Sequence, residues 1–223
     1  MQKSRVVVAI SGATGFMYGV KALQILRELG AETHLVMSKA AGLTREHETT
    51  LTRQDVIDMA DVFYPTGAVG AAISSGSFRT AGMIVAPCSM NTLAAIAGGQ
   101  TDNLVTRAAD VTLKERRRLV LMVRETPLHL GHIRNMATVT EYSAIVFPPV
   151  PALYAGPQSV DEIVTHSAAR AVGLLASSRN RSRVGERRSA RFRLTRNCSG
   201  SYVIVASASR SCLGTYLDAM WEG

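Results

Sequence analysis

The stretch RVVVAISGATG at residues 5–15 decides the fold class of this chain. Its first part, Arg5–Ile10, is a short continuous apolar run rich in valine, which is typical of a strand buried on both faces. Its second part, Ser11–Gly15, is a small polar turn with two glycines, and apolar residues at helical spacing follow over Phe16–Leu29. A buried strand that turns directly into a helix predicts the first unit of a parallel α/β sheet.

The same alternation continues to residue 178. Further apolar runs predict strands at Thr33–Met37, Gly82–Ala86, Leu119–Val123 and Ala144–Phe147. Helical spacing predicts helices at Ser89–Ala97, Asn103–Leu113, Leu130–Val139 and Val160–Leu175. We therefore expect residues 1–178 to form one α/β domain, with a parallel sheet that is covered by helices on both faces.

Residues 179–223 differ sharply in composition from the rest of the chain. They hold nine arginines against three acidic residues, and so carry six of the eight net positive charges. Because the remaining body is nearly neutral, we expect no nucleic-acid partner. We interpret residues 179–223 as an atypical basic Arg/Ser-rich C-terminal extension, solvated and partly disordered. Within it, Tyr202–Ala206 favours a strand and Gly214–Trp221 a short helix.

Composition and cysteine content also indicate in which cellular compartment the protein is expected. Hydrophobic residues make up 47% and charged residues 19% of the chain, which is typical of a globular protein. No apolar run approaches the roughly 18 residues that span a bilayer, so no membrane partner is expected. The three cysteines, Cys88, Cys198 and Cys212, form no CxxC pair. We therefore expect neither a disulfide framework nor a zinc site, and a cytoplasmic location.

Ligands of open parallel sheets bind beyond the carboxyl ends of the strands, where four segments are expected. These are Ser11–Gly15, Ser38–Lys39, Pro87–Thr92 and Arg124–Thr126. In the first, glycines let the backbone approach a ligand, and the helix that follows offers N–H groups and partial positive charge. This segment therefore favours an anion or nucleotide phosphate.

The segment Pro87–Thr92 opens a second helix and offers another polar cradle. Ser89 is a candidate N-cap, and Asn91 and Thr92 add polar groups on the ligand side. We expect Cys88 to be a small buried residue rather than a nucleophile.

Two charged stretches flank the predicted strand at Leu119–Val123. We interpret Arg116–Arg118, before it, as the solvated end of a helix. Arg124 and Glu125 follow it directly, where a charge must be paired or functional, and could bind a phosphate and transfer a proton. We interpret His129 and His132 as polar contacts or helix-surface residues.

Laid side by side, these segments resemble the flavin prenyltransferase (UbiX-type) family, formerly called aromatic acid decarboxylase subunits. The resemblance runs from about Arg5 to Arg170 in several blocks in the right order. They include ISGATG (10–15), ETHLVMSKAA (32–41), ISSGSF (73–78), GMIVAPCSMNTLA (82–94), RAADVTLKERR (107–117), LVLMVRETPLHLGH (119–132) and PPVPALY (148–154).

This resemblance implies an activity. The family are transferases that prenylate reduced FMN with dimethylallyl phosphate, forming a fourth ring at flavin N5 and C6 and releasing phosphate. The product, prenylated FMN, serves a UbiD-type decarboxylase. The resemblance further implies that residues 1–178 form a flavin-binding domain with a Rossmann-like (flavodoxin-like), doubly wound parallel sheet in three layers. It also implies a homododecamer and no metal requirement.

The resemblance also implies roles for individual residues. FMN would be held by Gly12, Ala13, Thr14, Ser38, Ser89, Met90, Asn91, Thr92 and Arg124. The prenyl phosphate would be held by Lys114, Tyr154 and Arg170, with Glu48, Arg107 and Glu125 around the reacting centre. These residue types suit the chemistry, because cations neutralise charge on a leaving phosphate and a carboxylate can move a proton.

The chain departs from the family pattern in places. Thr14 stands where serine is usual, and residues from Arg179 onward resemble nothing in the family. A family tryptophan near the C-terminus could correspond to Trp221. Two other functions stay open: a flavin-dependent cysteine decarboxylase-like enzyme, for which His47 is the candidate histidine, and a non-catalytic flavin-carrier subunit of an aromatic acid decarboxylase.

Overall fold

The computed structural model of the chain describes residues 3–176, 192–196 and 202–206. The chain divides into two compact units, residues 1–179 and residues 180–223. The first unit contains all the residues that the sequence suggests for a functional site.

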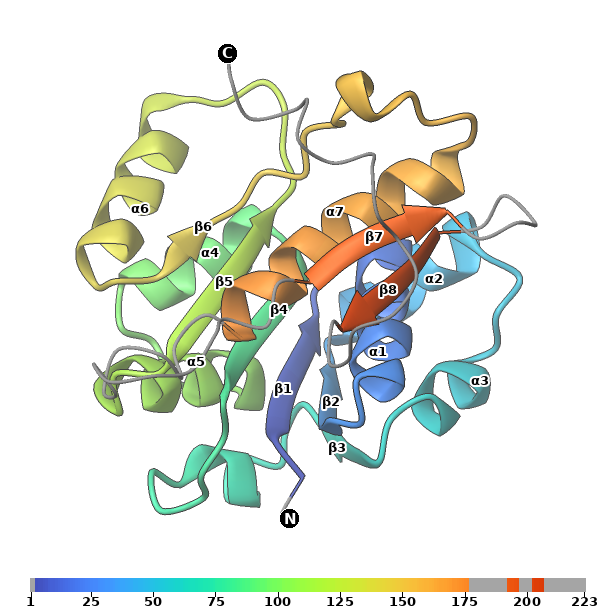
Figure 1. Cartoon of the computed structure of the whole chain (residues 1–223). Coiled ribbons are helices and arrows are strands. Elements are labelled where there is room, and N and C mark those ends of the chain that lie inside the picture. The colour runs from blue at the N-terminus through green and yellow to red at the C-terminus, as the bar shows by residue number, and fades with distance from the viewer. Residues whose placement is uncertain (1–2, 177–191, 197–201, 207–223) are drawn as a thin grey trace, which may run out of the picture. The chain divides into compact units, whose positions relative to one another are not determined.

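The first unit is built on six parallel strands in the order β3-β2-β1-β4-β5-β6 (Figure 1). They are β1 (Arg5–Ile10), β2 (Glu32–Met37), β3 (Val62–Pro65), β4 (Gly82–Cys88), β5 (Arg118–Val123) and β6 (Ile145–Val146). The strand order reverses between β1 and β4, and such a reversal opens the crevice in which doubly wound sheets bind ligands. The predicted fold class is confirmed.

Helices cover both faces of this sheet. They are α1 (Phe16–Glu28), α2 (Lys39–Glu48), α3 (Arg53–Asp58), α4 (Met90–Ala97), α5 (Leu104–Lys114), α6 (Leu130–Glu141) and α7 (Val160–Ala176), with short 3₁₀ turns at Ala72–Ser74 and Leu153–Ala155. Helices α1 and α7 lie side by side on one face, and α4 and α5 lie on the other (Figure 1). The first unit thus has a three-layer α/β architecture.

Burial on both faces explains the uninterrupted apolar strands. On β1, Val7 and Ala9 belong to the core shared with α4 and α5. Val8 and Ile10 point to the opposite face and are equally buried, with no exposed surface. Because neither face meets water, no polar residue alternates with these side chains.

In the first unit, one strand and two α-helices escaped the sequence analysis: β3, α2 and α3. Strand β3 has only four residues, lies at the sheet edge and ends in Pro65. Helix α2 buries one side chain, Ala41, so it has no apolar stripe to detect. Helix α3 is six residues long and likewise buries only Val56. The strands and helices predicted within residues 1–178 were all found, with ends shifted by at most two residues.

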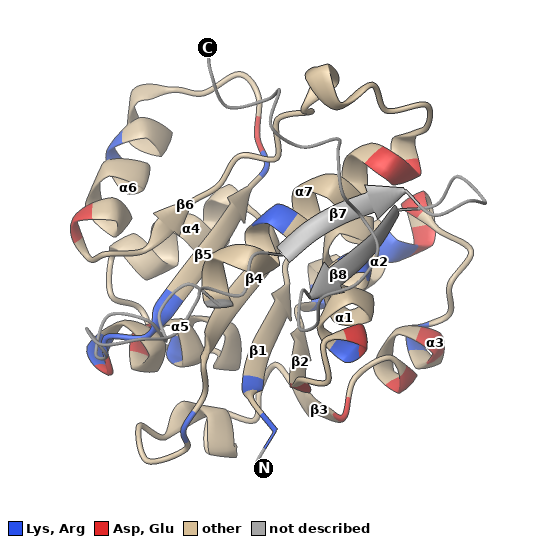
Figure 2. Cartoon of the chain, in the orientation of Figure 1, with Lys and Arg blue, Asp and Glu red and all other residues tan. Residues whose placement is uncertain are grey.

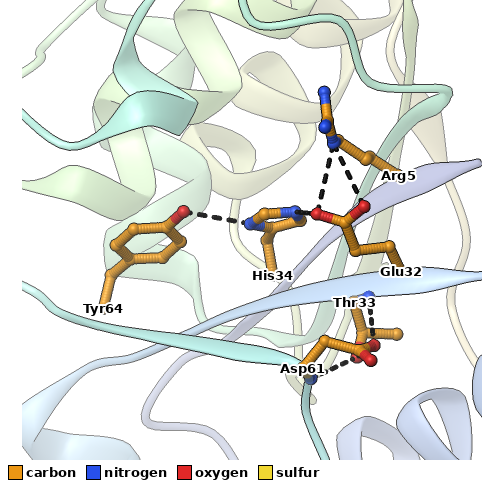
Figure 3. Close-up of polar contacts among 6 residues, drawn as sticks. All are labelled: Arg5, Glu32, Thr33, His34, Asp61 and Tyr64. Carbon is orange, nitrogen blue, oxygen red and sulfur yellow. Dashed lines mark hydrogen bonds and ion pairs between the residues drawn. The ribbon is translucent and has the colours of Figure 1, made fainter.

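A polar network ties β1, β2 and β3 together near the edge where these strands begin, here called the amino edge (Figure 3). The buried His34 ring places Nδ1 3.0 Å from the Tyr64 hydroxyl and Nε2 3.0 Å from a Glu32 carboxylate oxygen. Arg5 Nε donates to both Glu32 oxygens at 3.2 Å. Burial lowers the pKa of His34 against the opposing hydrogen bond from Glu32, so the ring is neutral at neutral pH.

A second polar contact joins β2 to the start of β3 beside this network (Figure 3). The Asp61 carboxylate accepts from the Thr33 N–H at 2.8 Å and from its hydroxyl at 3.0 Å. These hydrogen bonds lower the pKa of Asp61, because they favour the charged carboxylate. The amino edge therefore satisfies its polar groups internally.

The second unit contains two described strands. Strand β7 (Phe192–Arg196) pairs antiparallel with β8 (Tyr202–Ala206). The strand predicted at Tyr202–Ala206 is confirmed, while β7 was not predicted. The helix predicted at Gly214–Trp221, with Trp221 itself, lies outside the described residues. In the described ranges, no helix is long and apolar enough to cross a membrane.

Candidate active site

Three helices begin where the strands end, an edge here called the carboxyl edge. Helix α1 follows β1, α2 follows β2 and α4 follows β4, and these three strands are neighbours in the sheet. Helix N-termini carry partial positive charge and unpaired N–H groups, so three of them at one edge favour an anionic ligand.

Ser11 joins the two strands on either side of the crevice. Its hydroxyl donates to the Pro87 carbonyl at 2.9 Å, and the Ser89 N–H donates to the Ser11 hydroxyl oxygen at 2.8 Å. The Ser11 side chain is only 1% exposed. Its role is therefore to fix the two turns relative to each other, and a ligand would meet the residues beyond it.

Gly12 has no room for a side chain. A Cβ at this position would overlap the Cβ of Ala40 and lie 3.1 Å from the Ala40 carbonyl carbon in the first turn of α2. The absence of a side chain therefore lets the β1–α1 turn lie directly against α2.

Glu48, at the end of α2, caps the start of α1. Its carboxylate accepts from the Gly15 N–H at 2.9 and 3.0 Å and from the Phe16 N–H at 2.8 Å. We expected these N–H groups to be free for a phosphate, and for Gly15 and Phe16 this expectation was wrong. Sequence alone gave no sign of it, because the contact spans 32 residues and α2 was not predicted.

The serines at the other two turns cap their own helices. Ser38 accepts from the Ala41 N–H at 3.1 Å, and Ser89 accepts from the Thr92 N–H at 3.3 Å. The prediction that Ser89 is an N-cap is thus confirmed. Cys88 is fully buried, and burial raises the pKa of its thiol to about 12, so it stays a neutral thiol and not a nucleophile.

Arg124 carries the clearest signal for an anion. Its Nε atom is buried and has no hydrogen-bond partner within the described part of the chain. The same atom lies 3.7 Å from the position that a Cβ on Gly15 would take, so the guanidinium reaches from the end of β5 to the start of α1. Burial raises the pKa of the neighbouring Tyr18, and the Arg124 charge partly offsets that shift. Arg124 as a whole is half-buried, and its buried Nε atom calls for a partner such as an anionic ligand.

Glu125 and two histidines follow Arg124 on the way into α6. Glu125 is exposed and accepts from the Thr126 N–H at 2.9 Å rather than pairing with Arg124. His129 caps α6 through Nδ1, which accepts from the Gly131 N–H at 3.0 Å. The His129 and His132 ring centroids are 3.6 Å apart, and His132 Nδ1 is buried without a partner among the described residues. The interpretation of both histidines as polar contacts holds for His129.

The remaining predicted residues lie on exposed surface. Tyr154 is 84% exposed in the turn after β6, and Arg170 is exposed on α7. Arg107 lies on the first half of α5 and pairs with Asp110 at 3.1 Å. His47 is exposed on α2. No described contact joins these residues to one another.

Lys114 lies at the opposite end of the sheet from Arg124. It ends α5 just before β5 begins, at the amino edge, where Figure 2 shows basic residues gathered between the two elements. Strand β5 has six residues, so its two ends are roughly 17 Å apart. Within one chain, Lys114 therefore does not share a site with Arg124 and Glu125.

Arg117 corrects another expectation at the same place. We interpreted Arg116–Arg118 as a solvated helix end, but the Arg117 side chain is only 15% exposed. It donates to the Gly76 carbonyl at 2.6 Å and to the Phe78 carbonyl at 2.8 Å. Arg117 is thus a structural clamp for the segment before β4.

The residues at the carboxyl edge suit the phosphate end of a flavin nucleotide. They provide a half-buried cation whose buried Nε atom has no partner among the described residues, and hydroxyl groups on two helix starts. In the described part of the chain, no group of three or more His, Cys, Asp or Glu residues could hold a metal ion. Fold and site together define a phosphate-binding α/β protein of the nucleotide-cofactor class.

Comparison with known proteins narrows this class. A family model described as Flavoprotein matches residues 1–172. A curated flavin prenyltransferase UbiX from Neisseria meningitidis serogroup B is 60% identical over 170 residues, covering 76% of this chain and 90% of the relative. The chain belongs to the UbiX-type flavin prenyltransferase family of flavoproteins, as the sequence blocks predicted.

Two solved structures share its fold. The crystal structure of AnUbiX (PadA1) in complex with FMN and dimethylallyl pyrophosphate is 51% identical, with a TM-score of 0.78, and the match covers 78% of this chain and 93% of that one. A dodecameric FMN-dependent UbiX-like decarboxylase from Escherichia coli O157:H7 is 50% identical, with a TM-score of 0.76 and coverage of 77% and 94%.

Proposed function

We propose that this protein is a flavin prenyltransferase, which transfers a dimethylallyl group from dimethylallyl phosphate to reduced FMN and releases phosphate. The observation that carries the proposal is the likeness to AnUbiX, whose structure holds FMN and dimethylallyl pyrophosphate and is 51% identical to this chain. When bound, the reduced flavin supplies an electron-rich ring that attacks the allylic carbon. The protein has to hold both partners and neutralise the leaving phosphate.

The flavin-binding residues of this proposal lie at the carboxyl edge. Arg124 supplies a guanidinium whose buried Nε needs an anionic partner. The turn at Gly12–Thr14 offers backbone that can lie close to the ligand, and the helix starts at Ser38 and Ser89 add hydroxyls and partial charge. The proposed set is Gly12, Ala13, Thr14, Ser38, Ser89, Met90, Asn91, Thr92 and Arg124.

The proposed acid–base residues flank that set. Glu48 is held at the start of α1 next to Thr14, so its carboxylate stands at a fixed place beside the ligand. Glu125 follows Arg124, and its exposed carboxylate can give a proton to the leaving phosphate or take one from the ring. Both are carboxylates at the same edge as Arg124.

The prenyl phosphate site needs more than one copy of the chain. Lys114 lies at the amino edge, whereas Glu125 lies at the carboxyl edge and Tyr154 follows β6. Lys114 and Arg107 are seven residues apart on α5 and therefore share one helix face. We propose that this face serves the site of a neighbouring copy, where it joins Tyr154 and Arg170 around the phosphate. The dodecamer of the E. coli relative supports such an arrangement.

A UbiD-type decarboxylase is the proposed recipient of prenylated FMN, and the cytoplasm the proposed location. The first rests on the family and the second on the cysteine pattern of the sequence. The two other functions left open by the sequence, a cysteine decarboxylase and a flavin carrier, have no specific contact in their favour.

The decisive test is a product analysis. The protein is incubated without oxygen with reduced FMN and dimethylallyl phosphate, and the flavin is then analysed by mass spectrometry. We expect FMN that has gained one dimethylallyl group. Flavin that stays bound but unmodified would favour the carrier. The decarboxylase is tested in a separate incubation with oxidised FMN and a cysteinyl peptide, in which oxidative decarboxylation of the peptide with reduction of the flavin would favour it.

Mixing variants tests the shared site. Lys114→Met removes the cation at the amino edge and Arg124→Met removes the one at the carboxyl edge, and we expect each variant alone to be impaired. When the two are dissociated and assembled together, some sites combine an intact Lys114 with an intact Arg124 from different copies. Recovered activity in the mixture supports sharing, and no recovery despite mixed assembly contradicts it.

A further inference from the structure

The segment 75–78, Ser-Gly-Ser-Phe, is fastened to the end of α5. Arg117 holds it by donating to the carbonyls of Gly76 and Phe78 at 2.6 and 2.8 Å and to the Thr80 hydroxyl at 3.4 Å. A mostly buried guanidinium with three acceptors fixes backbone firmly, because its planar donors have set directions. The position of Gly76 relative to α5 is therefore well defined.

Next to Gly76 lies an ion pair between sequence neighbours. Lys114 Nζ is 2.5 Å from Glu115 Oε1, and Arg117 lies 3.9 Å from the other Glu115 oxygen. The Lys114 contact lowers the pKa of the Glu115 carboxyl, since both its hydrogen bond and its charge favour the ionised form. Consecutive residues on a helix do not normally face each other, so this pair depends on its surroundings.

The absence of a side chain at Gly76 leaves room for the ion pair between Lys114 and Glu115. A Cβ on Gly76 would overlap Glu115 Oε1 and lie 2.8 Å from Lys114 Nζ. The Gly76 backbone is outside the left-handed region, so the conformation does not call for glycine. The missing side chain instead leaves room for the ammonium and carboxylate to lie against the segment.

We propose that Glu115 and Gly76, held in place by Arg117, are positioning residues that fix the Lys114 ammonium for the prenyl phosphate. This inference rests on the proposed function, in which Lys114 binds that phosphate in a neighbouring copy. An ammonium has three N–H donors, so Lys114 can keep its bond to Glu115 and offer the others to the phosphate. A lysine ordered beforehand loses less conformational entropy on binding, and so binds the phosphate more tightly.

The alternative is an ordinary surface ion pair, which contributes little to any property. A positioning role and an ordinary surface ion pair predict different effects on phosphate binding when a methyl group is added at Gly76. It would displace the flexible tips of Lys114 and Glu115 without touching the flavin residues at the other edge. Gly70 provides a matched control, because it lies in the same connection before β4 and a Cβ there meets nothing within 4 Å.

The test compares Gly76→Ala, Glu115→Ala and Gly70→Ala in the full-length protein. We expect Gly76→Ala and Glu115→Ala to raise the KM for dimethylallyl phosphate about tenfold, the low end for weakening a charge-assisted hydrogen bond. The kcat at saturating dimethylallyl phosphate, the Kd for FMN and the melting temperature should match those of Gly70→Ala. Glu115→Gln, which keeps an acceptor but no charge, should fall between wild type and Glu115→Ala.

Two outcomes overturn the inference, and they are distinct from failure of the proposed function. An unchanged KM in Gly76→Ala and Glu115→Ala, with Lys114→Met impaired, would mean that Lys114 acts without these positioning residues. A lowered kcat with unchanged KM in both would assign them another role. If wild type makes no prenylated FMN, or Lys114→Met is as active as wild type, the proposed function itself fails.

Discussion

At the amino edge of the sheet, Arg5, Glu32 and His34 satisfy one another, whereas at the carboxyl edge the buried Nε of Arg124 has no partner among the described residues. Both edges belong to the same strands and differ only in which end is used. Buried polar groups are normally paired, since an unpaired one costs about 1–3 kcal/mol. The network of Arg5, Glu32 and His34 thus stabilises the fold, whereas the unpaired Nε of Arg124 costs stability and leaves a cation ready for a ligand.

The largest effect on flavin binding should come from adding a charged side chain at the carboxyl edge. Gly12→Asp places a side chain where even a Cβ overlaps Ala40, and adds a negative charge beside an anion site. We expect FMN binding to be lost, as measured by flavin retention on gel filtration. Gly42→Asp on α2 adds the same charge where a Cβ meets nothing within 4 Å, and should retain flavin. Equal retention by both variants would contradict the flavin placement.

Substitutions of the residues proposed to act on the prenyl phosphate should slow turnover and leave flavin binding unchanged. Arg170→Ala removes one charge-assisted contact to the leaving phosphate, which should lower the rate by roughly 30- to 1,000-fold. Glu125→Gln keeps the shape of the side chain and removes proton transfer, so it should slow turnover as well. Rates are measured from prenylated FMN formed over time. Wild-type rates in both variants would show that the assignment of these residues is wrong.

The two ends of β5 give the most direct comparison of the edges. Arg124→Met should weaken FMN binding by roughly 10- to 150-fold, the range for a hydrogen bond to a charged group. Arg118→Met makes the same change at the amino end of β5 and should leave the Kd for FMN unchanged. Fluorescence titration of FMN measures both. A similar loss in the two variants would remove the distinction between the edges.

A smaller effect is expected from titrating the amino-edge network. Burial lowers the pKa of His34 below its ordinary value of about 6.5, so its stabilising contribution is complete above that pH. The contribution is lost as the pH falls from there through the folded-state pKa, by at most about 1.4 kcal/mol per pH unit. Denaturant unfolding of wild type and His34→Gln at pH 7.5 and 5.5 tests this, at one protein concentration. The wild type should lose more stability than the variant, and equal losses would contradict the prediction.

The smallest effect should follow removal of the basic extension. We expect a chain ending at Ser178 to fold and to retain FMN, because the carboxyl-edge residues and the described sheet of the first unit all precede that point. Circular dichroism and flavin retention measure this. Aggregation of the shortened chain would show instead that residues 179–223 cover apolar surface or an oligomer contact.

Much of the fold could be predicted because burial on both faces leaves a strong sequence pattern. The apolar runs of β1, β4 and β5 mark central strands, and Ser89 marked a helix start by its side-chain chemistry. Elements that bury little could not be found this way: α2 buries one side chain and β3 is an edge strand of four residues. Consequently Glu48, at the end of α2, was suggested only by the resemblance to the family.

The sequence by itself determined the doubly wound sheet, the family and the turns at which a ligand would bind, because these depend on local patterns of apolar, glycine and capping residues. Only the tertiary structure decided which polar groups are already used. It showed Glu48 on the start of α1, Arg117 turned inward, and the Nε atom of Arg124 buried without a partner among the described residues. It also separated Lys114 from Arg124, although both adjoin β5. The residues that flank a strand lie at opposite ends of the sheet. Two residues on either side of a strand are therefore close in sequence but far apart in space.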